Sequence, residues 1–235
     1  MFASALLIYF LVSKATNKLE KSLKREKSMK TLLTQDMLTK LQVSTGYIQL
    51  LEEMDLSRDE KTYLRRALDE NLIALDLIED VRKISESDEV YEDSVEIISL
   101  VKKAIDENQQ FLKNVNTQVE EDLVDLLVKG DDGLKSLFAN LLKISVLNQK
   151  SSRIRVSFGE DGSNRVVRIE NDGKKIPSEI KNQIRDGDVY TGETAGVGGL
   201  RFYIISRLLN IYDASMNISR SYVGGIKYEV VLSKG

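Results

Sequence analysis

Residues 35–51, QDMLTKLQVSTGYIQLL, decide the fold of the N-terminal part of the chain. Their apolar side chains recur at steps of three and four residues, the spacing that forms one apolar stripe along an α-helix. No proline or glycine interrupts the chain between Met1 and Gly46. The pattern therefore predicts a continuous amphipathic helix that ends near Glu53. The stripe consists of Met37, Leu38, Leu41, Ile48 and Leu51.

A second helix is predicted directly after residues 54–57. Ser57 and Glu60 have the spacing of a capping box, in which each side chain bonds the backbone N–H of the other residue. Another apolar stripe follows, so residues 31–86 are expected to form a hairpin of two long antiparallel helices. Two helices cannot bury such wide stripes alone, and two copies are expected to form a dimeric four-helix bundle. The second stripe consists of Leu64, Leu68, Leu72, Leu75, Ile78, Val81 and Ile84.

The N-terminal end combines an apolar run with a basic run. Residues 1–13 are almost wholly apolar, but a membrane-spanning helix needs about 20 such residues. Three interpretations are open: a truncated membrane helix, a signal-peptide-like segment, or a helix that packs on a partner. Seven Lys and Arg residues at 14–30 favour the first, because basic residues flank membrane helices on the cytoplasmic side. We expect a membrane segment at 1–13, a basic linker helix at 14–30 and a location at the cytoplasmic face of the membrane. The alternative is a solvated basic helix with an apolar start.

A polar, acidic linker at 85–94 leads to a second domain at 95–235. Helical periodicity occurs at 98–113, 134–148 and 200–209, and short strands are predicted between these segments. This order of elements predicts an α+β sandwich with helices on one face of a mixed sheet. The strands are expected at 117–123, 126–128, 154–158, 166–170, 216–221 and 226–232.

Composition excludes several kinds of chemistry. Histidine and cysteine are both absent from the 235 residues. The chain therefore cannot carry a phosphohistidine, an imidazole general base, a disulfide or a thiolate metal site. The net charge of −3 gives no global basic signal, and nucleic acid is not expected as a partner.

The first helix resembles the phosphoacceptor helix of sensor histidine kinases. That helix typically reads His-Asp-Leu-Arg-Asn-Lys-Leu-Gln-Val, followed after two residues by Gly-Tyr. Asp36, the segment 41–43 (Leu-Gln-Val) and the pair Gly46-Tyr47 stand at matching positions. Gln35 stands where the phosphorylated histidine is expected. The resemblance implies a dimer, and the substitution implies that autophosphorylation is lost.

The second domain resembles the ATP-binding domain of histidine kinases and related ATPases. The family's helix motif, Asn-Leu-Leu-x-Asn-Ala, corresponds to residues 140–145, NLLKIS. Asn140 matches the first asparagine. Ile144 replaces the second, which in the family ligates Mg²⁺ through an oxygen atom. Ser145 and Asn148 are the nearby side chains that could compensate.

A loop motif of the family, Asp-x-Gly-x-Gly-Ile-Pro, corresponds to residues 171–177, NDGKKIP. Asn171 stands where an aspartate accepts a hydrogen bond from the adenine amino group, and its amide oxygen could still accept. The alternative is a one-residue shift that gives this role to Asp172. Gly173 matches the following glycine, whereas Lys175 replaces a glycine whose missing side chain lets the ligand approach.

The family's phosphate loop, Gly-x-Gly-Leu-Gly-Leu, brings backbone N–H groups to the phosphates. It corresponds to residues 196–202, GVGGLRF. Gly196, Gly198 and Gly199 remain, while Arg201 stands at the last glycine. The cations of Lys175 and Arg201 are expected to be exposed and to attract phosphate weakly.

The resemblance thus implies a degenerate sensor histidine kinase. We expect a pseudokinase without catalytic residues that acts by dimerisation and partner docking. Its partners would be a second copy, a true histidine kinase, or a response regulator bound to the hairpin. The enzymatic alternative is an ATP-binding domain that phosphorylates a partner's histidine in trans, and a third interpretation is a structural anchor. No cofactor or metal is expected, and any binding of Mg–ATP is expected to be weak.

Overall fold

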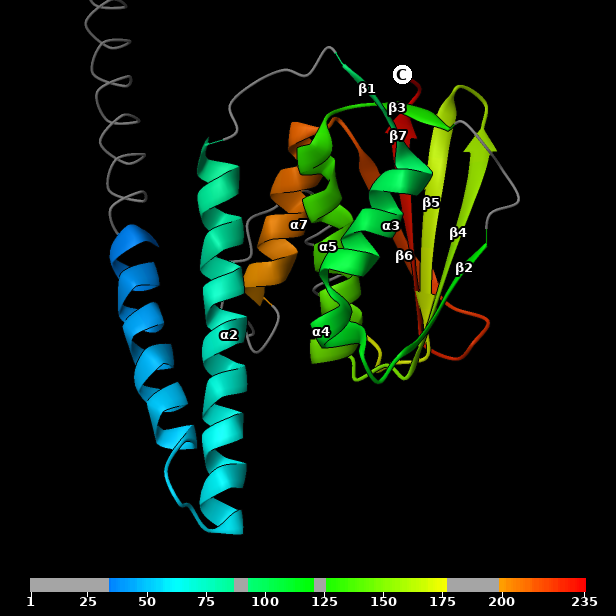
Figure 1. Cartoon of the computed structure of the whole chain (residues 1–235). Coiled ribbons are helices and arrows are strands. Elements are labelled where there is room, and N and C mark those ends of the chain that lie inside the picture. Colours follow the sequence, from blue (N-terminus) through cyan, green and yellow to red (C-terminus); the bar gives the residue numbers. More distant parts are fainter. Residues whose placement is uncertain (1–33, 87–92, 121–125, 177–198) are drawn as a thin grey trace, which may run out of the picture. The chain divides into compact units, whose positions relative to one another are not determined.

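The computed structural model describes residues 34–86, 93–120, 126–176 and 199–235. The chain divides into two compact units, Met1–Ser87 and Asp88–Gly235, and each is described by itself (Figure 1). The predicted membrane segment at 1–13 and basic linker at 14–30 lie outside the described residues. Within the described ranges, no helix is both long enough and apolar enough to cross a membrane.

The first unit contains the predicted helical hairpin. Residues 34–52 form one helix, and α2 (Arg58–Glu86) runs back beside it in the opposite direction (Figure 1). Between the two helices, Asn71 Nδ2 donates a hydrogen bond to Ser44 Oγ at 3.1 Å. The predicted hairpin is therefore confirmed over the described residues 34–86, and a polar contact joins its two helices.

The capping box at the start of α2 also forms as predicted. The backbone N–H of Ser57 donates to Glu60 Oε2 at 2.8 Å, and the N–H of Glu60 donates to Ser57 Oγ at 3.3 Å. These two bonds satisfy N–H groups that have no partner within the helix. The bonds from Ser57 stabilise the ionised carboxylate and lower the pKa of Glu60.

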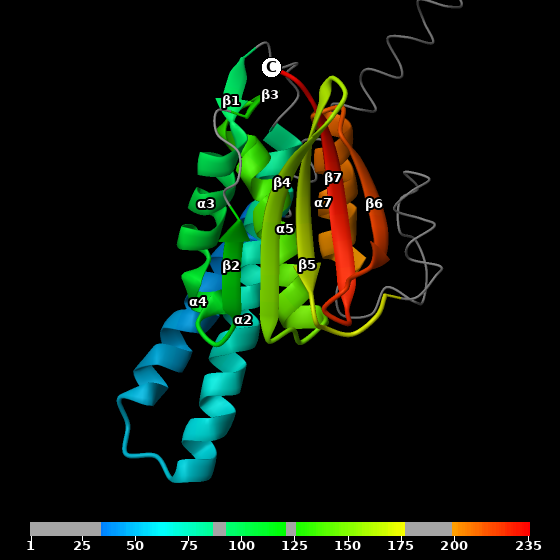
Figure 2. The same cartoon turned by 90° about the vertical axis from the view of Figure 1, so that its right-hand side faces the viewer.

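The second unit is built on a five-stranded mixed sheet with the order β2-β4-β5-β7-β6 (Figure 2). β2 and β4 are parallel, and every other neighbouring pair is antiparallel. A separate antiparallel pair is formed by β1 (Ser94–Glu96) and β3 (Leu127–Lys129). The main sheet consists of β2 (Asn116–Glu120), β4 (Arg153–Asp161), β5 (Asn164–Asn171), β6 (Ser215–Arg220) and β7 (Ile226–Ser233).

Three helices cover one face of this sheet: α3 (Ile97–Glu107), α5 (Lys135–Lys143) and α7 (Gly199–Ile211) (Figures 1 and 2). Alternation along the central strands directs one set of side chains toward the helices. The core between the two layers is fully buried, which confirms the predicted α+β sandwich. It includes Leu137, Leu141, Ile204, Val156, Ile169 and Tyr228.

The continuous helix predicted at 98–113 is wrong, because the chain leaves helical geometry at Asn108. Its backbone has φ −111° and ψ 19°, so α3 ends at Glu107 and the short helix α4 (Gln109–Leu112) follows. The Asn108 side chain donates through Nδ2 to Ala104 O at 2.7 Å. This bond satisfies a carbonyl that the broken helix would leave without a partner.

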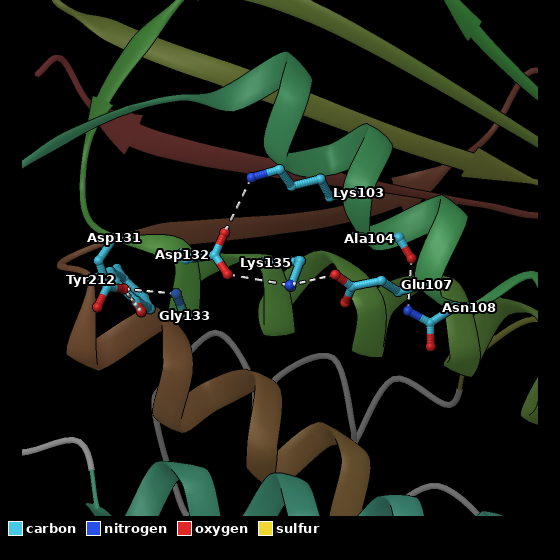
Figure 3. A network of polar contacts seen from close by, with 9 residues as sticks. All are labelled: Lys103, Ala104, Glu107, Asn108, Asp131, Asp132, Gly133, Lys135 and Tyr212. Atoms are coloured by element: carbon cyan, nitrogen blue, oxygen red, sulfur yellow. Dashed lines mark hydrogen bonds and ion pairs between the residues drawn. The ribbon is translucent and has the colours of Figure 1, made fainter.

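A polar network joins the start of α5 to the other two helices (Figure 3). Asp131 Oδ1 accepts from the Gly133 N–H at 2.9 Å and from the Tyr212 hydroxyl, just after α7, at 2.6 Å. Lys135 Nζ lies 2.7 Å from Glu107 Oε1 of α3. Exposed ion pairs contribute little free energy. We conclude that apolar burial holds the helix layer and that this network sets its register.

Gly225 allows the β6–β7 connection to pack against the end of β5. A Cβ atom at Gly225 would lie 2.4 Å from Asn171 O and 2.6 Å from Gly173 N, both backbone atoms. A Cβ at Gly159 would instead lie 2.6 Å from Arg168 Nη1, the mobile end of a side chain. The two glycines are therefore a matched pair for testing close backbone approach.

We predict that Gly225→Ala lowers the free energy of unfolding by about 1–3 kcal/mol, because backbone atoms must shift. Gly159→Ala should cost less than about 1 kcal/mol, since the Arg168 side chain can move aside. Urea unfolding followed by circular dichroism measures both. Equal losses in the two variants would contradict the packing described for Gly225.

Candidate functional site

The residues assigned to a nucleotide site come from three segments of the second unit. The helix of α5 continues into a π-helical turn (Ile144–Asn148), where the Gln149 N–H bonds to Ile144 O at 3.1 Å. β5 ends at Asn171, and α7 begins at Gly199. Gly196 and Gly198 lie outside the described residues. The described part of the site is therefore formed by the α5 side, the chain after β5 and the start of α7.

The side chain of Asn171 is fully buried and makes four hydrogen bonds. Its Nδ2 donates to Ser145 Oγ at 3.0 Å and to Gln149 Oε1 at 2.6 Å. Its Oδ1 accepts from the backbone N–H groups of Gly173 at 2.9 Å and Ile226 at 3.4 Å. A primary amide has two donor hydrogens and two acceptor lone pairs, so its bonding capacity is used. The two backbone donors also fix which atom is the oxygen.

Gln149 extends this network to the sheet. Its Nε2 donates to the hydroxyl of Tyr228 on β7, and both side chains are buried. Burial raises the pKa of Tyr228, which keeps the phenol neutral, although the bond from Gln149 opposes the shift. The Ser145 hydroxyl in turn donates to Leu141 O at 2.9 Å. The result is a closed, uncharged network of Ser145, Asn171, Gln149 and Tyr228 between the helices and the sheet.

Gly173 is a point of close approach within the chain. A Cβ at this position would lie 2.4 Å from Ser151 Oγ and 2.7 Å from Gln149 O. The neighbouring Lys174 N–H donates to that same Gln149 oxygen at 2.8 Å. The space next to Gly173 is therefore filled by the segment that follows the π-helical turn. Lys175, at the position of the second expected glycine, is exposed.

Asp172 faces the start of β4. Its carboxylate accepts from the Ser152 N–H at 2.8 Å, the Ser152 Oγ at 2.6 Å and the Arg153 N–H at 2.9 Å. Partial burial opposes ionisation, but these hydrogen bonds prevail and lower the pKa of Asp172 to about 2. The carboxylate is thus used to tie β5 to β4. This geometry gives no support to the alternative in which Asp172 makes the adenine contact.

The helix side of the site is apolar at one position and occupied by a cation at another. Ile144 is fully buried, so its side chain belongs to the core. Arg201 is only 2% exposed, and its Nη1 donates to Asn140 Oδ1 at 3.0 Å. Our expectation that Arg201 is an exposed cation is therefore wrong. The start of α7 faces α5, and the guanidinium is directed between these helices.

The expected phosphoacceptor position lies in the other unit. Gln35 and Asp36 are both exposed near the start of the first described helix. The Gln35 carbonyl accepts a bond from Thr39 Oγ1 at 3.0 Å. Across the described ranges, no cluster of three or more acidic side chains is arranged to hold a metal ion.

Comparison with known proteins bears on the second unit. Residues 130–234 match the family described as histidine kinase-, DNA gyrase B-, and HSP90-like ATPases. These residues form a histidine-kinase-type ATPase domain. The sensor histidine kinase CssS of Bacillus subtilis (strain 168) is 21% identical over 225 residues. The match covers 92% of this chain and 49% of CssS, so the chain spans about half the length of that curated relative.

Solved structures share the fold of the histidine-kinase-type ATPase domain. The catalytic domain of histidine kinase ThkA has a TM-score of 0.51 and 19% identity, covering 60% of this chain and 95% of ThkA's. The ATP binding domain of PrrB from Mycobacterium tuberculosis has a TM-score of 0.52 and 12% identity, and the match covers 63% of this chain and 99% of the PrrB chain. Full-length ShkA in complex with AMPPNP has a TM-score of 0.62 and 16% identity, and the match covers 88% of this chain and 46% of the ShkA chain. At these identities the likeness establishes the fold.

The sequence did not indicate two residues that form part of the site in this ATPase-type domain. Gln149 and Tyr228 hold the network together but stand 79 positions apart, and neither belongs to a motif. The resemblance identified Asn140, Asn171 and Arg201 by position. It did not indicate that Arg201 binds Asn140 or that the Asn171 amide is saturated by the protein itself.

The low pKa of Asp172 predicts a pH-dependent contribution to stability. The folded-state pKa of about 2 lies below the ordinary value of 3.8. The carboxylate therefore stabilises the fold by about 2 kcal/mol above pH 4, and this contribution is lost as pH falls toward 2. In urea unfolding, Asp172→Asn should differ from the wild type by that amount at pH 7 and by progressively less in acid. Asp161→Asn, at the exposed end of β4, is the matched control. A gap that did not change with pH would refute the assignment.

Proposed function

We propose that this chain is a two-component signalling protein that acts as a pseudokinase, by binding partners rather than by transferring phosphate. The histidine-kinase-type ATPase domain and the hairpin before it support the signalling assignment. The absence of histidine from the sequence supports the loss of autophosphorylation, and Gln35 stands at the expected phosphoacceptor position. In this proposal the protein lies at the cytoplasmic face of the membrane, as the apolar and basic runs of residues 1–30 suggest.

The saturated amide of Asn171 carries this proposal. An adenine amino group needs a free acceptor at this position, but Asn171 Oδ1 already accepts two backbone N–H bonds. Access would also require separating Asn171 from Gln149 and Ser145. Each lost bond costs about 0.5–1.5 kcal/mol. A new hydrogen bond from adenine to a neutral amide restores less free energy than one to a carboxylate would. The adenine end of the site is therefore closed by the protein's own side chains.

The metal end supports the same conclusion. Mg²⁺ binds oxygen ligands, and the buried hydrocarbon of Ile144 has none to offer. The adjacent space toward Asn140 holds the guanidinium of Arg201. Phosphoryl transfer depends on a metal ion and on positioning of the triphosphate. Mg–ATP thus does not fit the described side chains, and we assign it no step.

Partner binding, by contrast, is supported by an exposed apolar stripe on the first hairpin helix. Val43, Tyr47 and Leu50 recur at helical spacing and are 54%, 66% and 61% exposed, and Met54, just after the end of the helix, is 57% exposed. Isolated apolar side chains on a surface are ordinary, whereas a continuous stripe marks an interaction surface. We propose that a second copy of the hairpin, or that of a true histidine kinase, covers this stripe. A response regulator would dock on the resulting bundle.

The decisive test is calorimetric titration of the full chain with ADP and ATP analogues, with and without Mg²⁺. We predict a dissociation constant of about 1 mM or weaker, without dependence on Mg²⁺. We expect weak binding because the protein's own side chains occupy both the adenine end and the metal end of the site. A micromolar affinity that requires Mg²⁺ would overturn the pseudokinase proposal and favour phosphorylation of a partner's histidine in trans.

The dimer is tested by placing a charge in the stripe. Leu50→Asp should convert a dimer at micromolar concentration to a monomer, because the interface would have to bury an unpaired carboxylate. Gln49→Asp adds the same charge at the exposed position directly before Leu50 and should leave the dimer intact. Light scattering of the full chain measures both variants. A wild-type monomer under these conditions would exclude the proposed assembly.

A further inference from the structure

The guanidinium of Arg201 is a full charge buried between two helices. Arg201 is the third residue of α7, is 2% exposed, and donates through Nη1 to Asn140 Oδ1 of α5 at 3.0 Å. Arginine keeps its charge at every pH at which the protein folds. A charge removed from water is tolerated only where fixed acceptors replace the water. The position therefore depends on the groups around it, with Asn140 among them.

The acceptor is itself held in orientation. Asn140 is fully buried, and its Nδ2 donates to Ser136 O, one turn earlier in α5, at 2.9 Å. With the NH₂ group fixed on that carbonyl, the Oδ1 atom must point away from it, toward Arg201. The orientation of the acceptor is therefore set by a bond within α5 itself, independently of α7.

The location of this contact gives it a further meaning, which rests on the proposed function. Arg201 stands at the last glycine of the loop that, by resemblance, brings backbone N–H groups to phosphates. Asn140 lies one helical turn before Ile144, at the expected metal position. A cation from the protein itself thus lies beside the position where the family holds its metal and phosphates.

We propose that Arg201 is a tethered cation that occupies the phosphate end of the site, excludes nucleotide from it, and clamps α7 to α5 without a ligand. The α5–α7 arrangement is then set by the chain alone and does not respond to nucleotide or Mg²⁺. A partner protein would meet this domain in one fixed state.

The first experiment tests exclusion in a background that repairs the other two positions. Full-length Ile144→Asn/Asn171→Asp is compared with the same variant carrying Arg201→Gly, by calorimetric titration with Mg–ADP. We expect the Arg201→Gly variant to bind at least roughly tenfold tighter than its parent. Arg207→Gly, at an exposed position of the same helix, is the matched control and should give no gain. Equal affinities with and without Arg201 would overturn the proposal.

The affinity ratio between the two repaired variants can be interpreted whether or not the proposed function is correct. Mg²⁺-dependent micromolar binding by the wild type would refute the pseudokinase assignment, whereas the ratio between the two repaired variants tests Arg201 alone. A gain on removing Arg201, together with no binding by the wild type, would support both.

A second measurement decides the clamp if the repaired variants do not fold. Thermal unfolding of the full chain is followed for Arg201→Met, Asn140→Ala and the double variant. We expect each single change to lower the midpoint by about 5 °C, and the double variant to fall well short of the sum, because one contact is lost in all three. Arg207→Met should change the midpoint by less than about 1 °C. Additive shifts, or an Arg201→Met midpoint equal to that of the control, would overturn the clamp.

Discussion

Asn171 joins the two layers of the second unit through one side-chain amide. It belongs to β5, and it bonds Ser145 and Gln149 on the helix side, the turn at Gly173, and Ile226 at the start of β7. Because the amide is fully buried, an unmade bond would cost about 1–3 kcal/mol. Each neighbouring element is therefore constrained by it: the π-helical turn delivers Gln149, and the lack of a side chain at Gly225 lets the last hairpin approach.

The sequence predicts elements whose signals are local. The capping box of Ser57 and Glu60 spans three positions, and strands β4 and β5 follow from alternation around a short turn. The break at Asn108 was missed because helical periodicity continues across it, and a single side chain bonding back to Ala104 ends the helix. The site was predictable only as a set of positions. Its decisive contact joins Arg201 to Asn140 across 61 residues, and no periodicity reports such a pairing.

Two glycines show how packing of the chain on itself can require a glycine in the absence of a ligand. A side chain at Gly173 would collide with Ser151 and Gln149, and one at Gly225 would collide with the backbone at 171–173. Both positions are required by packing of the chain on itself. Glycine at Gly173 is thus no evidence for nucleotide, since the fold alone demands it. The informative positions are those where the residue differs from the one expected by resemblance, namely Ile144, Asn171 and Arg201.

The network around Asn171 is neutral, so an aspartate at position 171 would need its hydrogen-bond partners to be rearranged. A carboxylate oxygen there would oppose Gln149 Oε1, which now accepts from Nδ2. Rotation of the Gln149 amide would present Nε2 to the carboxylate, and the Tyr228 hydroxyl could then donate to the rotated oxygen. Ser145 could likewise turn its hydrogen from Leu141 O toward the new charge. A few side-chain rotations thus accommodate the charged residue without moving the backbone. The closure of the adenine end depends on side-chain chemistry at a few positions, within a backbone that has the fold of ATPase-type domains.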